Sequence, residues 1–428
     1  MSIDWHVTYA PKFTSRKRLG GVNRMKKKLI GIGALVLVLA LVLTLVPSCG
    51  RGGGEELGVT PTPGVGQEEE PQATPTPSAE EDRPLFSTAG WKTDFSKHSV
   101  AYSEIISGGV PRDGIPPIYD PKFESVTEAG VWLTDGDPVV SLVVGDQARA
   151  YPLRILLWHE IVNDEVAGIP VALTYCPLCN TAVAFDRSLQ GKVYTFGVSG
   201  LLRNSDLVMW DHETESLWQQ ATGEAIVGEL TGETLDFLSS SIVSWQDFEE
   251  AFPEGRVLSQ DTGYSRSYGI NPYVGYDASS RPFLFSGELD PRLPALERVI
   301  GVTISGDSVA YPFSALAQVG VANEDVGGGK IVVFYISGTL SPLDESSIED
   351  SREAGSAAVF DRTLDDRTLA FEVRDGDIVD RETGSIWNIF GQATEGSLKG
   401  QSLKPIIHGT HFWFAWAAFT PETRIYQA

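Results

Sequence analysis

The sequence predicts a β-rich α+β fold with two homologous repeats in tandem, behind a signal or anchor segment and a disordered spacer. Three observations support this prediction. Short runs of β-branched and aromatic residues, bounded by Gly, Asp and Asn, are typical of strands. Helix patterns are few. Residues 148–168 also align without gaps on residues 308–328, which indicates an internal duplication.

Residues 1–48 are predicted to be an export signal or a membrane anchor. Basic residues at 24–28 precede an uncharged apolar run at 29–46. The run ends in Val46-Pro47-Ser48-Cys49, which is similar to a bacterial lipoprotein box and would make Cys49 the lipidated N-terminus. The alternative is an uncleaved helix, because the run is about as long as a bilayer core requires. Both alternatives anchor the chain to a membrane and place it outside the cytoplasm, at the cell surface or in the periplasm.

The position of the start codon and the acidic composition lead to further predictions. Met25 is a better start for a signal segment than Met1, so we expect residues 1–24 to be an extension that results from a wrongly assigned start codon. Residues 49–84 are rich in Pro, Gly, Thr and Glu and are predicted to form a disordered acidic spacer. The net charge of -24 repels phosphate backbones, which argues against nucleic-acid binding.

The first repeat, residues 85–258, has the clearest secondary-structure patterns. The Gly145-Asp146 pair predicts a hairpin turn, and Ser244 is a suitable N-cap for the second of two predicted helices. The helices are expected at 153–160 and 244–252. Strands are expected at 139–144, 148–151, 171–175, 183–186, 192–197 and 207–210.

The second repeat, residues 298–428, follows an aromatic-rich connector at 259–297, which we expect to pack as a belt across the repeats. Residues common to both repeats are interpreted as scaffold, and residues present in one repeat are candidates for function. The two repeats share Tyr-Pro at 151–152 and 311–312, and a matching segment at 211–218 and 380–387.

A Cys-x-x-Cys motif occurs in the first repeat alone. Cys176 and Cys179 lie in LTYCPLCNTAVAFDR, whereas the second repeat has GSAAVFDR. The alignment places Ser337 opposite Cys176, Val319 opposite His159 and Gly320 opposite Glu160. The second repeat therefore lacks both thiols, the histidine and its acidic neighbour, and is interpreted as a degenerate copy that serves as scaffold or partner surface.

These residues suggest a soft-metal centre with Cys176, Cys179 and His159 as ligands. Thiolates and imidazole suit zinc or copper, and the fourth coordination position of the metal would be open or occupied by another side chain of the protein. The candidates for that position are Glu160, His212 and Met209. A polar group after a Gly-rich turn would line the same site; its candidate members are Arg203, Asn204 and Asp206.

Two alternatives to a metal remain open. A Cys-Pro-x-Cys order is typical of thiol-redox sites, but here a strand-like stretch follows and no βαβ pattern surrounds it. The pair would otherwise form a structural disulfide in a non-catalytic envelope protein, although so short a loop contributes only about 2 kcal/mol. The sequence leaves the reaction, and any protein or small-molecule partner, unknown.

Four stretches carry a family resemblance. WHEIVNDEVAG, YCPLCNTAVAFDR, GLLRNSDLVMWD and HFWFAWAAF together resemble the domain-of-unknown-function family numbered 3179, found in exported proteins of bacteria and archaea. The resemblance implies an extracytoplasmic setting and the Cys-x-x-Cys motif, without an established reaction.

Overall fold

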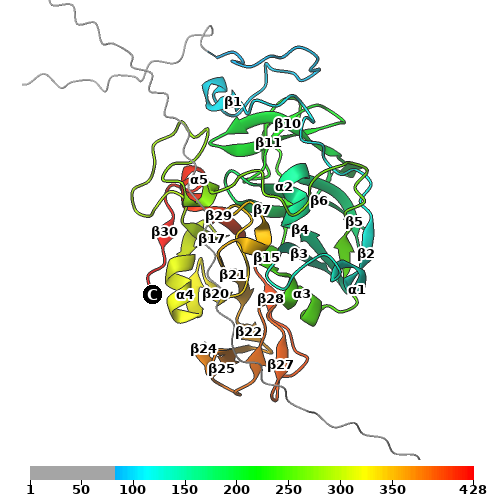
Figure 1. Ribbon diagram of the computed structural model, residues 1–428. Helices are drawn as coiled ribbons and strands as arrows, with labels where there is room; N and C mark the ends of the chain where they lie inside the picture. The colour runs from blue at the N-terminus through cyan, green and yellow to red at the C-terminus, as the bar shows by residue number, and fades with distance from the viewer. Residues whose placement is uncertain (1–81) are drawn as a thin grey trace, which may run out of the picture. The chain divides into compact units, whose positions relative to one another are not determined.

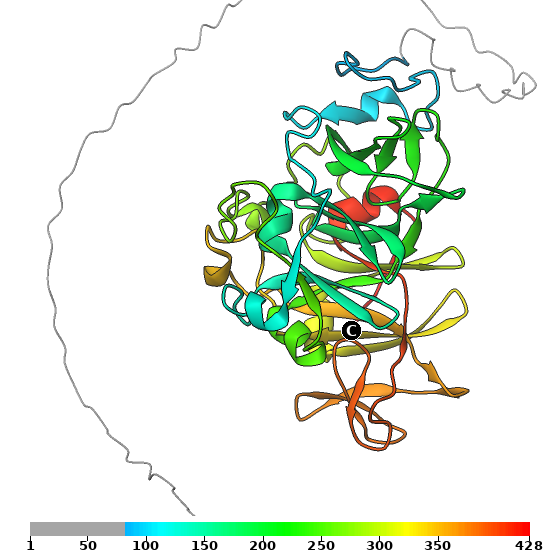
Figure 2. The ribbon, with the colours of Figure 1, turned by 90° about the vertical axis from the view of Figure 1, so that its right-hand side faces the viewer.

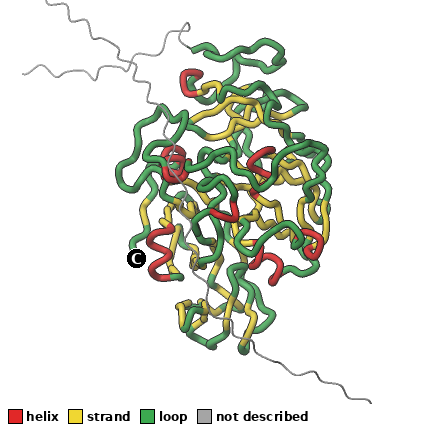
Figure 3. Tube along the Cα trace, viewed as in Figure 1, coloured by secondary structure: helices red, strands yellow, loops and turns green. Residues whose placement is uncertain are grey.

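Strands dominate the part of the chain that the structure describes. In the computed structural model, residues 82–428 contain thirty strands and five short α-helices, joined by long loops (Figure 3). The helices are α1 (Val126–Ala129), α2 (Leu153–His159), α3 (Trp245–Ala251), α4 (Phe313–Val319) and α5 (Trp413–Phe419). The predicted β-rich α+β class is confirmed.

The predicted N-terminal features lie outside the described residues. These are the signal or anchor segment at 1–48, the lipidation site Cys49 and all but the last three residues of the spacer at 49–84. Within residues 82–428, no helix is long and apolar enough to span a membrane. Residues 82–428 belong to one compact unit.

The same order of elements occurs twice along the chain. The first series is β3 (Pro138–Val144), β4 (Gln147–Pro152), α2, β5 (Ile161–Val166), β6 (Ile169–Cys176) and β7 (Thr181–Asp186). The second series is β17 (Arg298–Ile304), β18 (Asp307–Pro312), α4, β19 (Val321–Val326), β20 (Gly329–Ile336) and β21 (Ser356–Asp361). The hairpin at Gly145-Asp146 and the helix capped by Ser244 form as predicted.

The largest sheet takes strands from both series. Its order is β30-β18-β17-β29-β7-β6-β5, and β14 also pairs with β7. The additional strands are β14 (Asp236–Leu238), β29 (Gly409–Phe412) and β30 (Arg424–Ile425). The two halves of the sheet meet where Thr410 of β29 pairs with Ala182 of β7. β29 therefore lies between β17 of the second series and β7, the strand that follows the cysteine motif.

Two other sheets share a hydrophobic core between the series. One has the order β15-β3-β4-β16-β2 and the other β19-β20-β21-β28. Val139 and Val243 of the first sheet and Val332 and Phe360 of the second belong to one buried cluster. The additional strands are β2 (Phe123–Ser125), β15 (Ser240–Ser244), β16 (Arg256–Leu258) and β28 (Lys404–Pro405).

The remaining strands form hairpin-based sheets, which lie at opposite ends of the view in Figure 1, where β10 and β11 are above and β24 and β25 below. The first sheet contains β1 (Ile105–Ser107), β10 (Phe196–Arg203), β11 (Asp206–Asp211), β12 (Leu217–Gln219) and β13 (Ala225–Val227). The second contains β24 (Phe371–Arg374), β25 (Asp377–Asp380), β26 (Ile386–Trp387) and β27 (Ala393–Glu395). Two-stranded ribbons are β8 (Ser188–Leu189) with β9 (Lys192–Val193), and β22 (Thr363–Leu364) with β23 (Arg367–Thr368).

The β10–β11 hairpin is longer than its counterpart β24–β25. In each hairpin the strand pairing begins, at the end away from the turn, with a phenylalanine opposite an aspartate. These residues are Phe196 and Asp211 in the first hairpin and Phe371 and Asp380 in the second. The first continues past a bulge after Val198 and ends at the pair Arg203–Asp206, whereas the second ends at Arg374–Asp377. The run predicted as one strand at 192–197 is divided between β9 and β10, which is a correction to the prediction.

Candidate metal centre

The cysteine motif forms the tight turn between β6 and β7. Cys176 ends β6, where it pairs with Thr181, and Cys179 lies within the turn. The Tyr175 hydroxyl donates a hydrogen bond to Asn180 Oδ1 at 3.0 Å, which braces the turn, and Asn180 itself has φ of 50°. Both thiols are free and buried. A strand follows the second cysteine, as the sequence predicted.

Asp206 completes a group of three ligand atoms. The extended hairpin carries Asp206, at the start of β11, to the cysteine turn. The Sγ of Cys179 lies 2.9 Å from Asp206 Oδ1. The two sulfurs and a carboxylate oxygen all lie within 4.8 Å of one another. Cys176 is 2% exposed, and Cys179 and Asp206 are 0% exposed.

The second carboxylate oxygen of Asp206 has its own donors. Oδ2 accepts hydrogen bonds from Gln219 Nε2 at 2.5 Å and from the Ala221 backbone N–H at 2.9 Å. Arg203 in turn donates to Gln219 Oε1 at 3.4 Å and pairs with Glu104 at 2.6 Å. These contacts fix the carboxylate and leave Oδ1 directed at Cys179, as is common for outer partners of metal ligands.

Burial shifts the acid–base equilibria of this group. It raises the pKa of Asp206 to about 6, against the hydrogen bonds from Cys179, Ala221 and Gln219. It raises the pKa of the Cys179 thiol well above its usual range, with Cys176 and Asp206 adding to the effect. Glu160 has its pKa raised to about 8, first by burial and then by Asp206. The group therefore disfavours further negative charge unless a cation is bound.

Glu160 has an unusual backbone conformation. It is the C-cap of α2 with φ of 57°, and the matching C-cap of α4 is Gly320 with φ of 70°. Glycine adopts this left-handed region without steric cost, whereas a glutamate does so at a cost in free energy. The Glu160 carboxyl is also only 6% exposed, so this position combines an unfavourable backbone conformation with a buried acid.

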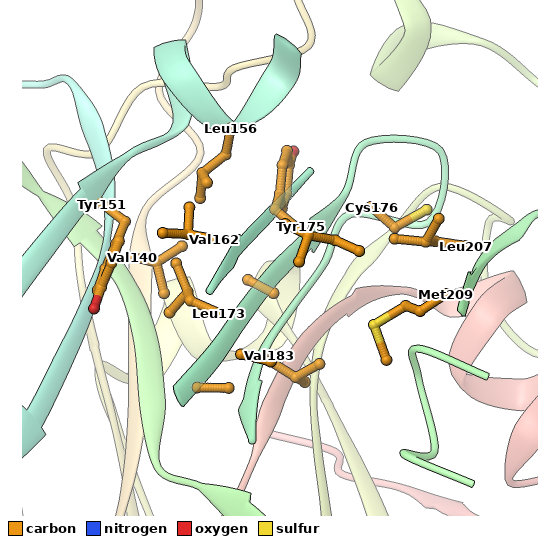
Figure 4. Close-up of a cluster of buried hydrophobic side chains, with 14 of the residues drawn as sticks. Val140, Tyr151, Leu156, Val162, Leu173, Tyr175, Cys176, Val183, Leu207 and Met209 are labelled. Atoms are coloured by element: carbon orange, nitrogen blue, oxygen red, sulfur yellow. The ribbon is translucent and has the colours of Figure 1, made fainter. Parts of the chain in front are cut away.

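A pocket of about 380 Å³ adjoins the group. Glu160, Leu178 between the cysteines and Leu207 next to Asp206 line it. Tyr273 and Tyr276 of the connector form another part of its wall, and the Tyr276 hydroxyl donates to the Leu178 carbonyl at 2.7 Å. In Figure 4, Cys176 and Leu207 lie next to each other at one end of the drawn cluster of buried side chains.

The connector packs on the core as expected, but it also lines this pocket. The second series holds it in place: the Tyr276 backbone N–H donates to Leu343 O at 3.0 Å, and the Gly275 N–H to Asp344 O at 2.6 Å. Leu343 and Ile348 belong to the same buried cluster as both cysteines. The insert that replaces the cysteine turn in the second series therefore buttresses the pocket.

His159 has other partners. It ends α2, its Nδ1 lies 2.7 Å from the Pro116 carbonyl oxygen and its Nε2 lies 2.6 Å from the Tyr268 hydroxyl. Among the described residues, the three-ligand group contains Asp206 and not His159. Both ring nitrogens of His159 therefore have hydrogen-bond partners outside the three-ligand group.

The additional candidates occupy different surroundings. His212 stacks on Trp210 with ring centroids 4.4 Å apart and meets the Tyr119 hydroxyl at 3.0 Å. Met209 is buried in the main core, and Asn204 lies in the hairpin turn with φ of 53°. Of the candidates that the sequence named beside the cysteines, Asp206 is in the three-ligand group and Glu160 lines the adjoining pocket.

The strand register corrects one detail of the alignment. Ile161 pairs with Thr174, and Val321 pairs with Phe334, so the two series are offset by the same number of residues through β6 and β20. Ile336, and not Ser337, therefore stands opposite Cys176. A one-residue slip moves every side chain to the other face of the sheet, which is why the register decides this point.

The fold and the site define a β-rich protein with a buried group of two cysteines and one aspartate that can hold a metal ion. The chain belongs to the family described as protein of unknown function (DUF3179), whose model matches residues 112–423. No curated protein and no solved structure matches the chain.

Proposed function

We propose that the protein binds one zinc ion through Cys176, Cys179 and Asp206, beside a pocket that admits a small ligand. The observation that carries this proposal is the convergence of the three ligand atoms within 4.8 Å in a buried site. Three protein ligands leave one coordination position free, as in catalytic zinc sites. When bound, zinc in such a site polarises a water or a ligand group.

The donor set favours zinc over copper. Thiolates attract soft ions, whereas a carboxylate attracts harder ones, and zinc accepts both. A divalent cation would also compensate the charge of two thiolates and a carboxylate in surroundings where burial raises the pKa of Cys179 and of Asp206. Glu160, which lines the pocket, is placed to interact with a metal-bound water or ligand.

Thiol-redox chemistry is the weaker alternative. A redox-active cysteine pair needs an accessible thiolate with a lowered pKa. Here the pKa of Cys179 is raised, and both thiols are almost completely buried.

The cellular setting that we propose rests on the sequence. The basic flank, the apolar run and the lipoprotein box ending in Cys49 support export and a lipid anchor. We also propose that the chain carries two homologous repeats, at 85–258 and 298–428, joined by the connector at 259–297. The recurring order of strands and helix, with paired C-caps at Glu160 and Gly320, supports a duplication in which the second copy became a buttress.

Metal analysis by mass spectrometry of full-length protein, purified in detergent without chelator, tests the centre. We expect about one zinc per chain, lost in Cys176→Ser, Cys179→Ser and Asp206→Asn and retained in His159→Ala. Circular dichroism spectra would show that the variants fold. Absence of metal after incubation with zinc, or loss of metal in His159→Ala alone, would overturn the proposed ligand set.

A further inference from the structure

A second pocket, which shares no lining residue with the pocket beside the cysteine turn, lies between the β3–β15 strand pair and residues 360–408. Its volume is about 530 Å³, within the range of sites for small molecules. The aromatic walls are Phe252, Phe360 and Phe390, and hydroxyl groups of β3 and β15 form a polar side. β15 contacts β21 of the second series, and Figure 2 shows the molecule from the side, with the orange strands toward the C-terminus in its lower half.

The polar side has an unpaired hydroxyl. Ser141 and Ser241 are directly opposite each other in the β3–β15 pair. Ser141 is 4% exposed, and its Oγ has no hydrogen-bond partner within the described part of the chain. An unsatisfied buried hydroxyl costs about 1–3 kcal/mol, so a ligand group that bonded Ser141 Oγ would remove this cost.

His408 sets the direction of the neighbouring hydrogen bond. Its Nδ1 lies 2.7 Å from the Ile406 carbonyl oxygen, which can only accept, so Nδ1 carries the proton. Burial lowers the pKa of His408, and the neutral ring leaves Nε2 as an acceptor. Nε2 lies 3.0 Å from Ser241 Oγ, which must therefore donate to it. Ser241 then presents lone pairs to the pocket, next to the free O–H of Ser141.

The corresponding position in the second series is filled. The register places Gly301 of β17 where β3 has Ser141, since Tyr151 pairs with Val140 and Tyr311 with Ile300. Trp416 covers Gly301 so closely that a Cβ there would lie 2.3 Å from the indole ring. The opening at Ser141 is therefore a property of one series and not of the shared architecture.

We propose that this pocket binds a small uncharged ligand through a hydroxyl or carboxamide group held by Ser141 and Ser241. Such a group accepts from Ser141 and donates to Ser241 at once, while the apolar body of the ligand lies against the phenylalanine rings. Among the lining residues, all in the described part of the chain, Asp146 is the one charged side chain, and it would repel anions.

The test uses 2-naphthamide as the probe and 2-naphthoate as its charged counterpart, titrated calorimetrically into the full-length protein in detergent. We expect 2-naphthamide to bind at one site and 2-naphthoate at least about ten-fold more weakly. Ser141→Ala should weaken 2-naphthamide about five-fold, the effect of one hydrogen bond. Val143→Trp, at a 43% exposed lining position, should abolish binding by filling the pocket without disturbing the core.

Thr303→Ala, an exposed change on β17, serves as the control and should leave binding unchanged. Failure of 2-naphthamide to bind, or binding that survives Val143→Trp, would overturn the proposal; the second result would place the probe elsewhere, for example beside Glu160. Zinc content measured on the same samples keeps this outcome separate from that of the metal centre.

Discussion

The Cys179 Sγ lies 2.9 Å from Asp206 Oδ1, although 27 residues separate the two in the chain. The contact depends on the extension of the β10–β11 hairpin beyond Val198, which the β24–β25 hairpin lacks. The extended hairpin follows the first series, which holds the cysteine turn, and the shorter hairpin follows the second series, which lacks that turn. This joint occurrence is the reason to regard the extension and the turn as one functional unit.

Asp206→Asn is expected to separate metal binding from folding. The amide keeps an oxygen but loses the charge, so we expect zinc affinity to fall by at least about 100-fold with the fold intact. Asp211→Asn is the matched control, since Asp211 is equally buried and accepts from Trp218 Nε1 at 2.8 Å. It should cost about 2 kcal/mol of stability and leave zinc affinity unchanged. Competition with a chromophoric chelator measures the affinity, and a similar loss in both variants would contradict the assignment.

Gln219→Leu is expected to act through Asp206. Gln219 holds Oδ2 of Asp206, and removal of an outer partner of this kind typically lowers metal affinity about 10- to 100-fold. The neighbouring Gln220→Leu is the control, because Gln220 donates to Thr174 and to the Thr181 carbonyl instead. The same chelator competition applies. Equal zinc affinity in wild type and Gln219→Leu would show that Asp206 does not need this support.

Glu160→Gly is expected to stabilise the metal-free protein. The change removes a buried carboxyl and relieves a left-handed backbone, with a gain of about 1–2 kcal/mol. The reverse change in the other series, Gly320→Ala, should destabilise it, because φ is 70° and the new Cβ would lie 2.4 Å from Val373 Cγ2. Urea unfolding curves give both values. A Glu160→Gly variant less stable than wild type would mean that Glu160 has a structural role.

Ionisation of Glu160 should lower the stability of the metal-free protein as the pH rises from 5.5 to 8.5, whereas the buried imidazoles of His408 and His411, whose pKa values are lowered by burial, act in the opposite direction. The pKa of Glu160 is about 8 in the folded state against an ordinary 4.5, so its contribution to stability is complete below pH 4.5 and is lost as the pH rises to 8. Over this interval the loss is about 3 kcal/mol. Urea unfolding at both pH values should show a clearly smaller loss in Glu160→Gln. Equal losses in the variant and in wild type would refute this explanation.

Much of the fold could be predicted from local sequence. The Gly145-Asp146 turn, the Ser244 cap and the strand after Cys179 follow from short-range patterns, and the structure confirms them. The break between β9 and β10 was missed because the run at 192–197 has no Gly or Pro before its end. The alignment slip at Cys176 arose where sequence identity is low, although the Tyr175–Tyr335 match would have fixed the register.

The site could be predicted only in part. The absence of the Cys-x-x-Cys motif from one series pointed to Cys176 and Cys179, but the third ligand depends on how far a hairpin reaches. His159 was preferred for its chemistry, whereas Asp206 lies in the group because of its position at the start of β11. Tyr273 and Tyr276 come from the connector, whose path over the pocket is set by contacts with residues 341–348 that no local pattern shows.

The most direct test of the metal centre is X-ray absorption spectroscopy at the zinc K-edge on full-length protein loaded with one equivalent of zinc. The structure predicts a first shell of two sulfurs at about 2.3 Å and one or two oxygens at about 2.0–2.2 Å. Asp206→Asn should lose zinc or show a changed oxygen contribution, and His159→Ala should give the wild-type spectrum. A first shell without sulfur, or one that contains an imidazole lost in His159→Ala, would contradict a centre built from Cys176, Cys179 and Asp206.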